Sequence, residues 1–290
     1  MNRIESYGRK AAWPVVIALA AFIVAGCGGG GGGGDPVAAP GPGPAPEPVV
    51  VDAAGGVSTD PGSVPLGDAG TFVILAQAGV TNVPTSPITG NVGAHPITGA
   101  AIGVTCAEVT GTAPGKIFDT DGAYTGGGAA DVSCRVTDAT LLDTAVDDSA
   151  AAYGDAAGRT AGVLNLGGGT LSGEILAPGT YTWNGTSATL NITGDITLSG
   201  SATDVWIFQV AGNLNQSPAT KVNLKDGALS KNVFWQVGGA ATSIGTTAHI
   251  AGIVITVGSV ALDTGASVDG RLYTLGSVTL EQNTVTRPAL

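Results

Sequence analysis

Residues 253–270 read IVITVGSVALDTGASVDG, and residues 271–288 read RLYTLGSVTLEQNTVTRP. The two stretches align without a gap, so the chain repeats here with a period of 18 residues. Three short strands at about 3.3 Å per residue, joined by turns, use about that many residues in one triangular coil. Because stacked coils of this kind bury a continuous aliphatic core, the repeat predicts a β-solenoid.

Earlier segments repeat the strand motif more loosely. Residues 205–212 read VWIFQVAG, and residues 232–239 read NVFWQVGG. Aromatic residues make up only 5% of the chain, whereas Gly occurs 48 times. Small aliphatic side chains and frequent glycines favour thin, repetitive β-structure over a globular α/β enzyme.

Residues 138–157 are the one stretch with a clear helical period. Apolar and small side chains recur there at helical spacing, namely Leu142, Val146, Ser149 and Tyr153. Thr137 or Asp138 can cap the start of the helix. Its face is narrow and rich in alanine, so we expect it to pack closely against a sheet.

Residues 103–136 are irregular, and they contain Cys106 and Cys134. We expect this segment to form a capping excursion at one end of the domain. Two cysteines in one exported domain usually pair, which favours a disulfide. A metal site is the alternative, but it would need further ligands nearby, and His95 and His249 are isolated in the sequence. No metal and no cofactor are therefore expected.

The N-terminus has the pattern of an export signal, with basic residues followed by an apolar stretch at 11–25 that is short for a membrane span. Residues 24–27 read VAGC, which resembles a bacterial lipoprotein cleavage box. We therefore predict a signal peptide at 1–26 and lipid attachment at Cys27. An uncleaved membrane anchor is the alternative. Either reading predicts an exported protein held at the cell envelope, with an outer-membrane or cell-surface location favoured.

The segment 27–63 begins with seven consecutive glycines and continues into a Pro/Ala-rich stretch. Glycine-rich chain is flexible and proline-rich chain is extended, so we predict a tether between the lipid and the folded domain. The folded domain is expected to cover residues 64–290.

The formal net charge is −11, with 11 Lys and Arg against 22 Asp and Glu. An acidic surface repels phosphate backbones, so a nucleic-acid partner is not expected. We expect the domain to be monomeric.

Six segments together resemble a known family, the microbial ice-binding proteins with the DUF3494 or type 1 ice-binding fold. They are LGDAGTFVIL at 66–75, ITGNVG at 88–93, AYGDAAGR at 152–159, DVWIFQ at 204–209, KNVFWQV at 231–237 and TGASVDGR at 264–271. The resemblance covers residues 64–288 in the family's order. It implies a mostly β fold, a discontinuous right-handed β-solenoid with one long α-helix packed alongside. It also implies a capping excursion and one flat face that binds ice.

Ice is a rigid array of water molecules, so its binder needs a flat, repetitive surface with little charge. Residues 232–262 contain no Asp, Glu, Lys or Arg. The aligned coils give two columns of residues that would share one face of the strands. The predicted ice-binding residues are Ala76, Gln209, Gln236, Thr256 and Thr274 in the first column, and Ala78, Ala211, Gly238, Gly258 and Gly276 in the second, with Ser259 and Ser277 beside them. The alternative face carries Thr247, Thr264 and Ser267. A further alternative is that these strands are simply buried.

Two other functions fit the pattern less well. Solenoid enzymes need clustered carboxylates with basic partners, but Asp147 and Asp148 would point apart on a helix, and no nucleophile elbow is present. A cell-surface adhesin or glycan-binding module would suit the tether equally well, but Trp206 and Trp235 lie inside apolar strand motifs. We therefore predict a protein that is not an enzyme, whose partner is the ice surface. It would inhibit ice growth and recrystallisation, or attach the cell to ice.

The lipid attachment gives a first prediction. Replacing Cys27→Ala removes the only acceptor that the cleavage box offers, so the domain should leave the membrane fraction without losing its fold. Fractionation and immunoblotting would measure this, with circular dichroism as the test of folding. A folded variant that stays with the membrane would instead mean that the N-terminal segment is an ordinary membrane anchor.

Overall fold

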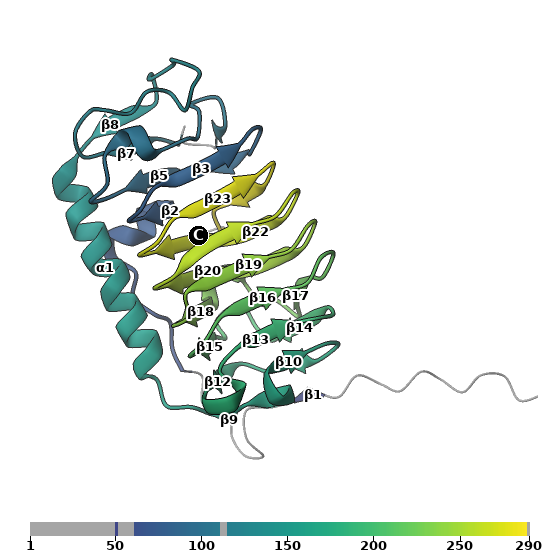
Figure 1. Ribbon diagram of the computed structural model, residues 1–290. Helices are drawn as coiled ribbons and strands as arrows, with labels where there is room; N and C mark the ends of the chain where they lie inside the picture. Colours follow the sequence, from purple (N-terminus) through teal and green to yellow (C-terminus); the bar gives the residue numbers. More distant parts are fainter. Residues whose placement is uncertain (1–49, 52–60, 111–114, 289–290) are drawn as a thin grey trace, which may run out of the picture. The chain divides into compact units, whose positions relative to one another are not determined.

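Parallel β-strands wind into a stack of coils, and one helix, α1, runs along the side of the stack (Figure 1). The structure is a computed structural model that describes residues 50–51, 61–110 and 115–288. The strands form three sheets, and every strand pair is parallel within the described residues. Successive coils therefore present equivalent strands one above another.

The three sheets contain the following strands in spatial order. The four-stranded sheet consists of β1 (Val50–Val51), β11 (Ile175–Leu176), β14 (Ile196–Ser199) and β17 (Val222–Lys225). The seven-stranded sheet consists of β10 (Thr170–Leu171), β13 (Leu190–Ile192), β16 (Leu214–Gln216), β19 (Ala241–Ile244), β21 (Ser259–Leu262), β23 (Val278–Glu281) and β3 (Val80–Val83). The largest sheet consists of β8 (Arg135–Thr137), β7 (Ile117–Asp119), β5 (Asn91–Ala94), β2 (Phe72–Ala76), β22 (Ser267–Thr274), β20 (His249–Thr256), β18 (Val233–Val237), β15 (Trp206–Val210), β12 (Gly179–Trp183) and β9 (Val163–Leu164). In the same sheet β24 (Thr284–Thr286) pairs with β22, β4 (Ile88–Thr89) pairs with β24, and β6 (Val109–Thr110) pairs with β4.

The solenoid is discontinuous, as the family resemblance implied. Strand β2, near the start of the domain, lies between β5 and β22, so Ile74 pairs with Leu272 from the last coil. Strand β3 likewise pairs with β23. After β5 to β8 the chain crosses the length of the stack as α1, and it then climbs back coil by coil from β9.

The interior is filled by aliphatic side chains and a stack of aromatic rings. The rings of Phe208 and Trp235 lie parallel with their centroids 4.0 Å apart, and Tyr181 continues the stack on the other side of Phe208. Trp206 and Trp235 are fully buried, and their indole N–H groups donate to the carbonyls of Leu176 and Ala251. The apolar motifs around these tryptophans thus form the core rather than a surface site.

Helix α1 spans Ala139–Gly158, one residue later than the expected 138–157. The Asp138 carboxylate accepts a hydrogen bond from the Leu141 N–H at 3.0 Å and so caps the helix, which explains why the helical bonds begin after it. Its buried residues are Leu142, Ala145, Ser149, Ala152 and Ala156. They pack on the outer side of the largest sheet, against a second apolar cluster that includes Phe72, Ile255 and Tyr273. The helix therefore shields that side of the sheet from water.

The segment predicted as a capping excursion contains β6, β7 and β8, which extend the largest sheet. Cys106 and Cys134 form the expected disulfide, with Cα atoms 5.5 Å apart. Glu108 ties the same region to β3 and the turn after it. Its carboxylate accepts hydrogen bonds from the backbone N–H groups of Ser86 and Thr105 and from the Asn82 amide. Burial raises the pKa of Glu108, but these hydrogen bonds outweigh it and hold the pKa below its ordinary value.

The expected tether and leader fall mostly outside the described residues. Residues 50–51 and 61–63 of the range 27–63 are described, and Val50 and Val51 form strand β1 and pair with β11. An edge strand such as β11 offers unpaired N–H and C=O groups, which gives this short segment a place to pair. The signal peptide at 1–26 and Cys27 are not described. Among the described residues, no helix is long and apolar enough to cross a membrane.

The disulfide gives a prediction for stability. It closes a sequence separation of 28 residues, and the chain-entropy model assigns about 3–4 kcal/mol to a loop of that size. The double variant Cys106→Ala, Cys134→Ala should therefore unfold at a lower urea concentration than the oxidised protein. The reducing agent dithiothreitol should shift the parent protein in the same direction and leave the variant unchanged. Equal midpoints for all samples would contradict a stabilising role.

Candidate ice-contacting face

The outer side of the seven-stranded sheet is a regular surface, which we call the seven-stranded face. Side chains alternate along each of its strands, because successive residues of a strand point to opposite sides. In β21, Val260 and Leu262 are buried in the core, whereas Ser259 and Ala261 point outward. The same alternation of buried and outward residues recurs in β13, β19 and β23.

A central column of uncharged residues crosses all seven strands of this face. Each member is the backbone partner of the next, in the order Thr81, Thr279, Ala261, Ser243, Asn215, Asn191 and Thr170. Adjacent strands lie about 4.7–4.9 Å apart, so the column places a small side chain at that interval along the stack. The column is therefore straight, small and neutral.

Hydrogen bonds along the stack hold several of these side chains in place. The hydroxyls of Thr81 and Thr279 are 3.1 Å apart, and the Asn215 amide donates to the Asn191 carbonyl oxygen at 3.0 Å. Beside the central column, Ser277 donates to Ser259 at 3.3 Å. These contacts orient the outward polar groups before any partner arrives.

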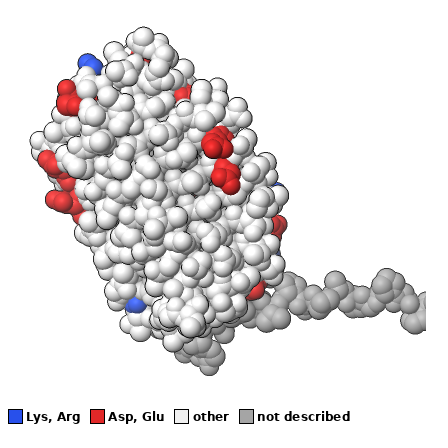
Figure 2. Space-filling model, viewed as in Figure 1, with Lys and Arg blue, Asp and Glu red and all other residues white. Residues whose placement is uncertain are grey.

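Charge is kept to the margins of the seven-stranded face. Figure 2 shows a broad uncharged area on the side of the molecule that carries β3, β16 and β13, with acidic residues toward its borders. Asp263 follows the end of β21, and Glu281 ends β23. Within the described ranges, no group of three His, Cys, Asp or Glu side chains could hold a metal ion.

The first predicted column does not form a surface, and its residues belong to two sides of the largest sheet. Thr256, Thr274 and Ala76 are backbone partners of one another, and their side chains point to the core side of this sheet. Gln209 and Gln236 pair with each other on the opposite side, toward α1. All five are at most 7% exposed. The prediction of an ice-contacting column through these residues was wrong.

The wrong alignment arises because the corners that connect the strands of successive coils differ in length. Val237, and not Gln236, is the partner of Thr256. Residues 238–240 separate β18 from β19, whereas only residues 257–258 separate β20 from β21. A shift of one residue moves a side chain to the other side of a strand, so an alignment without gaps combined inward and outward positions.

The buried threonines have a structural role at the same corners. The Thr256 hydroxyl accepts a hydrogen bond from the Gly258 N–H at 3.1 Å, and the Thr274 hydroxyl accepts one from the Gly276 N–H at 2.9 Å. Each hydroxyl thus accepts a hydrogen bond from a backbone N–H at a point where the chain turns between two sheets.

The second predicted column lies at these corners and not on a flat face. A Cβ on Gly258 would collide with the backbone carbonyl of Ala240, and one on Gly276 would collide with Ser259. Gly238 is level with Val257 rather than with Gly258, since Val237 pairs with Thr256. The members most open to solvent are Ala78 and Ala211. The glycines are therefore required for close packing between coils.

The residues of the alternative face also stack on one another, since the Thr247 N–H donates to the Thr264 carbonyl and Ser267 is the backbone partner of His249 and Thr284. Thr247 sits in a turn with a positive φ of 57°. Ser267 is half-buried, with its hydroxyl 2.9 Å from His249 Nδ1, and Thr264 donates to Glu281. These side chains are engaged in local contacts at another corner.

Comparison with known proteins places the chain in a family. The family model described as "Ice-binding-like" matches residues 74–286. The chain belongs to the ice-binding-like family. An ice-binding protein of Flavobacterium frigoris is 51% identical over 78% of this chain and 76% of its own length, and one of a Colwellia species is 45% identical over 80% and 87%. The solved structure of an ice-binding protein from an Arctic yeast superposes with a TM-score of 0.68 at 32% identity, covering 80% of this chain and 97% of that one.

Only Ser259 and Ser277 of the predicted residues point outward on the seven-stranded face of this ice-binding-like protein. The residues that the sequence analysis missed form the central column. Their signal was present in the repeat itself, where SVAL at 259–262 and SVTL at 277–280 alternate small and apolar residues. This alternation identifies the outward positions of a half-buried strand, which the sequence of the apolar strand before it does not.

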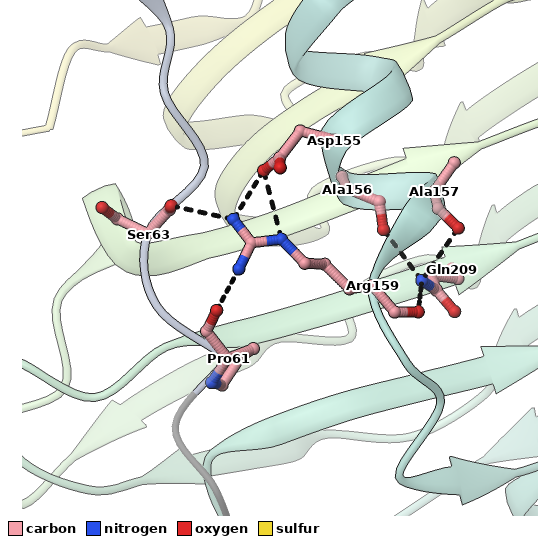
Figure 3. A network of polar contacts seen from close by, with 7 residues as sticks. All are labelled: Pro61, Ser63, Asp155, Ala156, Ala157, Arg159 and Gln209. Carbon is pink, nitrogen blue, oxygen red and sulfur yellow. Dashed lines mark hydrogen bonds and ion pairs between the residues drawn. The ribbon is translucent and has the colours of Figure 1, made fainter.

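Gln209 fastens helix α1 to the sheet (Figure 3). Its amide nitrogen donates to three carbonyls at the end of the helix, those of Ala156 at 2.8 Å, Ala157 at 3.2 Å and Arg159 at 2.8 Å. The last carbonyls of a helix have no partner within it, so this one side chain satisfies groups that would otherwise be left unpaired.

Arg159 extends the same network in the opposite direction. Its guanidinium bonds to the Asp155 carboxylate at 2.6 Å and donates to the carbonyls of Pro61 and Ser63 (Figure 3). The segment that precedes the first strand of the ice-binding-like domain is thereby held beside the end of α1.

This network gives a prediction for Gln209. The variant Gln209→Leu leaves the helix carbonyls without their partner, so the free energy of unfolding should fall by about 1–3 kcal/mol. Urea denaturation followed by circular dichroism would measure it. Gln236→Leu on the adjacent strand is the matched control, because the Gln236 amide has no partner among the described residues and its loss should cost little. Equal losses in both variants would contradict the assigned role.

Proposed function

We propose that this chain binds ice through the seven-stranded face, and that binding inhibits ice growth and recrystallisation or attaches the cell to ice. The observation that carries the proposal is the central column, in which seven neutral side chains repeat at the spacing of a parallel sheet. The relatives named as ice-binding proteins supply the partner.

The chemistry of the face suits a solid water surface. Charged groups hold their own hydration tightly, and the face keeps them at its margins. Its Thr, Ser and Asn side chains can take part in an ordered water layer, while Ala261 and the threonine methyl groups keep the surface smooth. Threonine is also stiff at χ1, so ordering it costs little rotamer entropy.

Ice binding of this kind depends on many weak contacts made together. A rigid face engages a rigid lattice at many points, so the first contact raises the effective concentration for the next. Flatness and area then matter more than any single hydroxyl. The stacked sheet provides both, because its backbone ladder fixes the height of each outward residue.

Neither of the other functions receives comparable support. The matched family consists of ice-binding proteins and not of enzymes. The relatives do not favour an adhesin without ice activity. We also infer that the protein is exported and lipid-anchored through Cys27 and acts as a monomer. The disulfide between Cys106 and Cys134 supports an oxidising compartment outside the cytoplasm.

A bulky residue in the central column tests the proposed function. Ala261→Tyr places a ring that lifts the face off the lattice, so the concentration needed to inhibit ice recrystallisation should rise by roughly tenfold or more. Ala261→Ser keeps the surface flat and should change it little. A splat-cooling assay of recrystallisation would measure both.

The matched control is Thr197→Tyr, which places the same ring on an outward position of the four-stranded sheet. It should leave recrystallisation inhibition unchanged, and circular dichroism should report an intact fold for all three variants. Full activity of folded Ala261→Tyr, combined with loss of activity in Thr197→Tyr or Thr264→Tyr, would overturn the choice of face.

A further inference from the structure

The two margins of the seven-stranded face differ in charge. At one margin acidic residues follow four of the seven strands: Glu281 ends β23, Asp263 directly follows β21, and Asp195 and Glu174 come three residues after β13 and β10. At the other margin the chain enters the seven strands from the largest sheet, and none of its corners carries a charged residue. These corners are residues 77–79, 165–169, 184–189, 211–213, 238–240, 257–258 and 275–277. The seven-stranded face is therefore acidic along one side only.

Two of the acids lie directly beside the central column. Asp263 and Glu281 come two residues after Ala261 and Thr279, which are backbone partners in that column, so they take the next outward positions on the same side of the sheet. Positions two residues apart on a strand are separated by about 6.6–6.8 Å. Both acids are half-buried, and the Thr264 hydroxyl donates to the Glu281 carboxylate at 3.1 Å, which holds that side chain in place.

These carboxylates limit how far a lattice of ice can extend over the face. A carboxylate holds its own water tightly, and removing that water without a compensating partner costs free energy. Glu281 and Asp263 belong to the second and third of the seven strands in spatial order, so their water shells lie next to each other. A flat lattice that covers the central column cannot pass over two hydrated groups on adjacent strands. Its contact must therefore end at this margin.

The opposite margin offers apolar side chains instead. Val257 and Leu275 directly follow the backbone partners Thr256 and Thr274, so they stack at the same corner. Val257 is 37% exposed and Leu275 is 45% exposed. The outward residue Ser259 comes two positions after Val257. Because apolar groups gain free energy when they leave water, the uncharged surface continues from the face onto this corner.

We propose that the contact with ice is off-centre on the seven-stranded face. It begins at the corner formed by Val257 and Leu275, crosses the outward residues of the strands, and ends at Asp263 and Glu281, which set its width. The inference rests on the proposed function, because it divides the proposed face into a part that touches ice and an acidic margin that stays hydrated.

Neutral residues of the same size test the acidic boundary. The double variant Asp263→Asn, Glu281→Gln removes both charges, and the amide oxygen at position 281 can still accept from Thr264. The contact should widen, so the concentration needed to inhibit ice recrystallisation should fall by about twofold or more. The matched control is the double variant Asp68→Asn, Asp269→Asn, which removes two charges outside the seven-stranded face and should act as the parent does.

A charge at the apolar corner tests the other boundary. Val257→Glu brings a hydrated group into the contact, so the concentration needed should rise by about fivefold or more, whereas Val257→Gln, of equal size, should cost less. Leu275→Glu is a second variant at the same corner and decides the question if Val257→Glu does not fold. Val132→Glu is the matched control, because Val132 is 39% exposed and lies in the capping excursion.

Ala261→Tyr, measured in the same assay, separates this inference from the proposed function. The off-centre contact is overturned if the folded Asp263→Asn, Glu281→Gln variant is no better than the parent or improves only as much as its control. Full activity of the folded Glu variants at Val257 and Leu275 would overturn it as well. In each of these cases a loss of activity in Ala261→Tyr still supports the seven-stranded face, whereas full activity of folded Ala261→Tyr contradicts the face itself.

Discussion

The close stacking of backbone on backbone at the corners of the coils sets the geometry of everything else in the molecule. Parallel strands repeat at about 4.8 Å, and each corner must turn within that height. Gly258 lies against the carbonyl of Ala240, and Gly270 lies against Gly252, at distances that leave no room for a methyl group. A side chain at either glycine would push two coils apart. The outward columns of the seven-stranded sheet would then lose their common plane, since their height is fixed by the ladder and not by their own contacts.

Helix α1 solves a different problem that the solenoid creates. The outer side of the largest sheet carries Phe72, Leu75, Ile255 and Tyr273, which would form a large exposed apolar patch without a cover. The small residues of the helix let it lie close over that patch, and Gln209 satisfies the carbonyls at its end. The helix thereby covers one side of the domain and forms a second core with it, whereas the seven-stranded face stays uncovered.

Much of the fold could be predicted from the sequence, because periodicity reports which residues are buried. The 18-residue repeat, a helix cap at Thr137 or Asp138 and the pairing of Cys106 with Cys134 all follow from local patterns. The structure contains the repeat and the disulfide, and Asp138 is the cap. The position of the exposed face did not follow. It depends on the number of residues at each corner, and the extra residue at 238–240 inverts the alignment of Gln236 with Thr256. Local composition has no signal for such a shift, whereas the small and apolar alternation of the seven-stranded sheet does identify outward positions.

The insertion of β2 between β5 and β22 has a consequence for how the domain is made and how it can change. Phe72 and Arg271, which meet in the finished sheet, are 199 residues apart in the chain. A nascent chain that has left the ribosome only as far as β20 can pair β2 with β5 but not yet with β22, so the pairing with the longest separation comes last. The stack of coils thus has two open ends, while strands β2 and β22, from the start and the end of the domain, pair with each other inside it. Coils gained or lost between β9 and β20 would lengthen or shorten the seven-stranded face without breaking this joint.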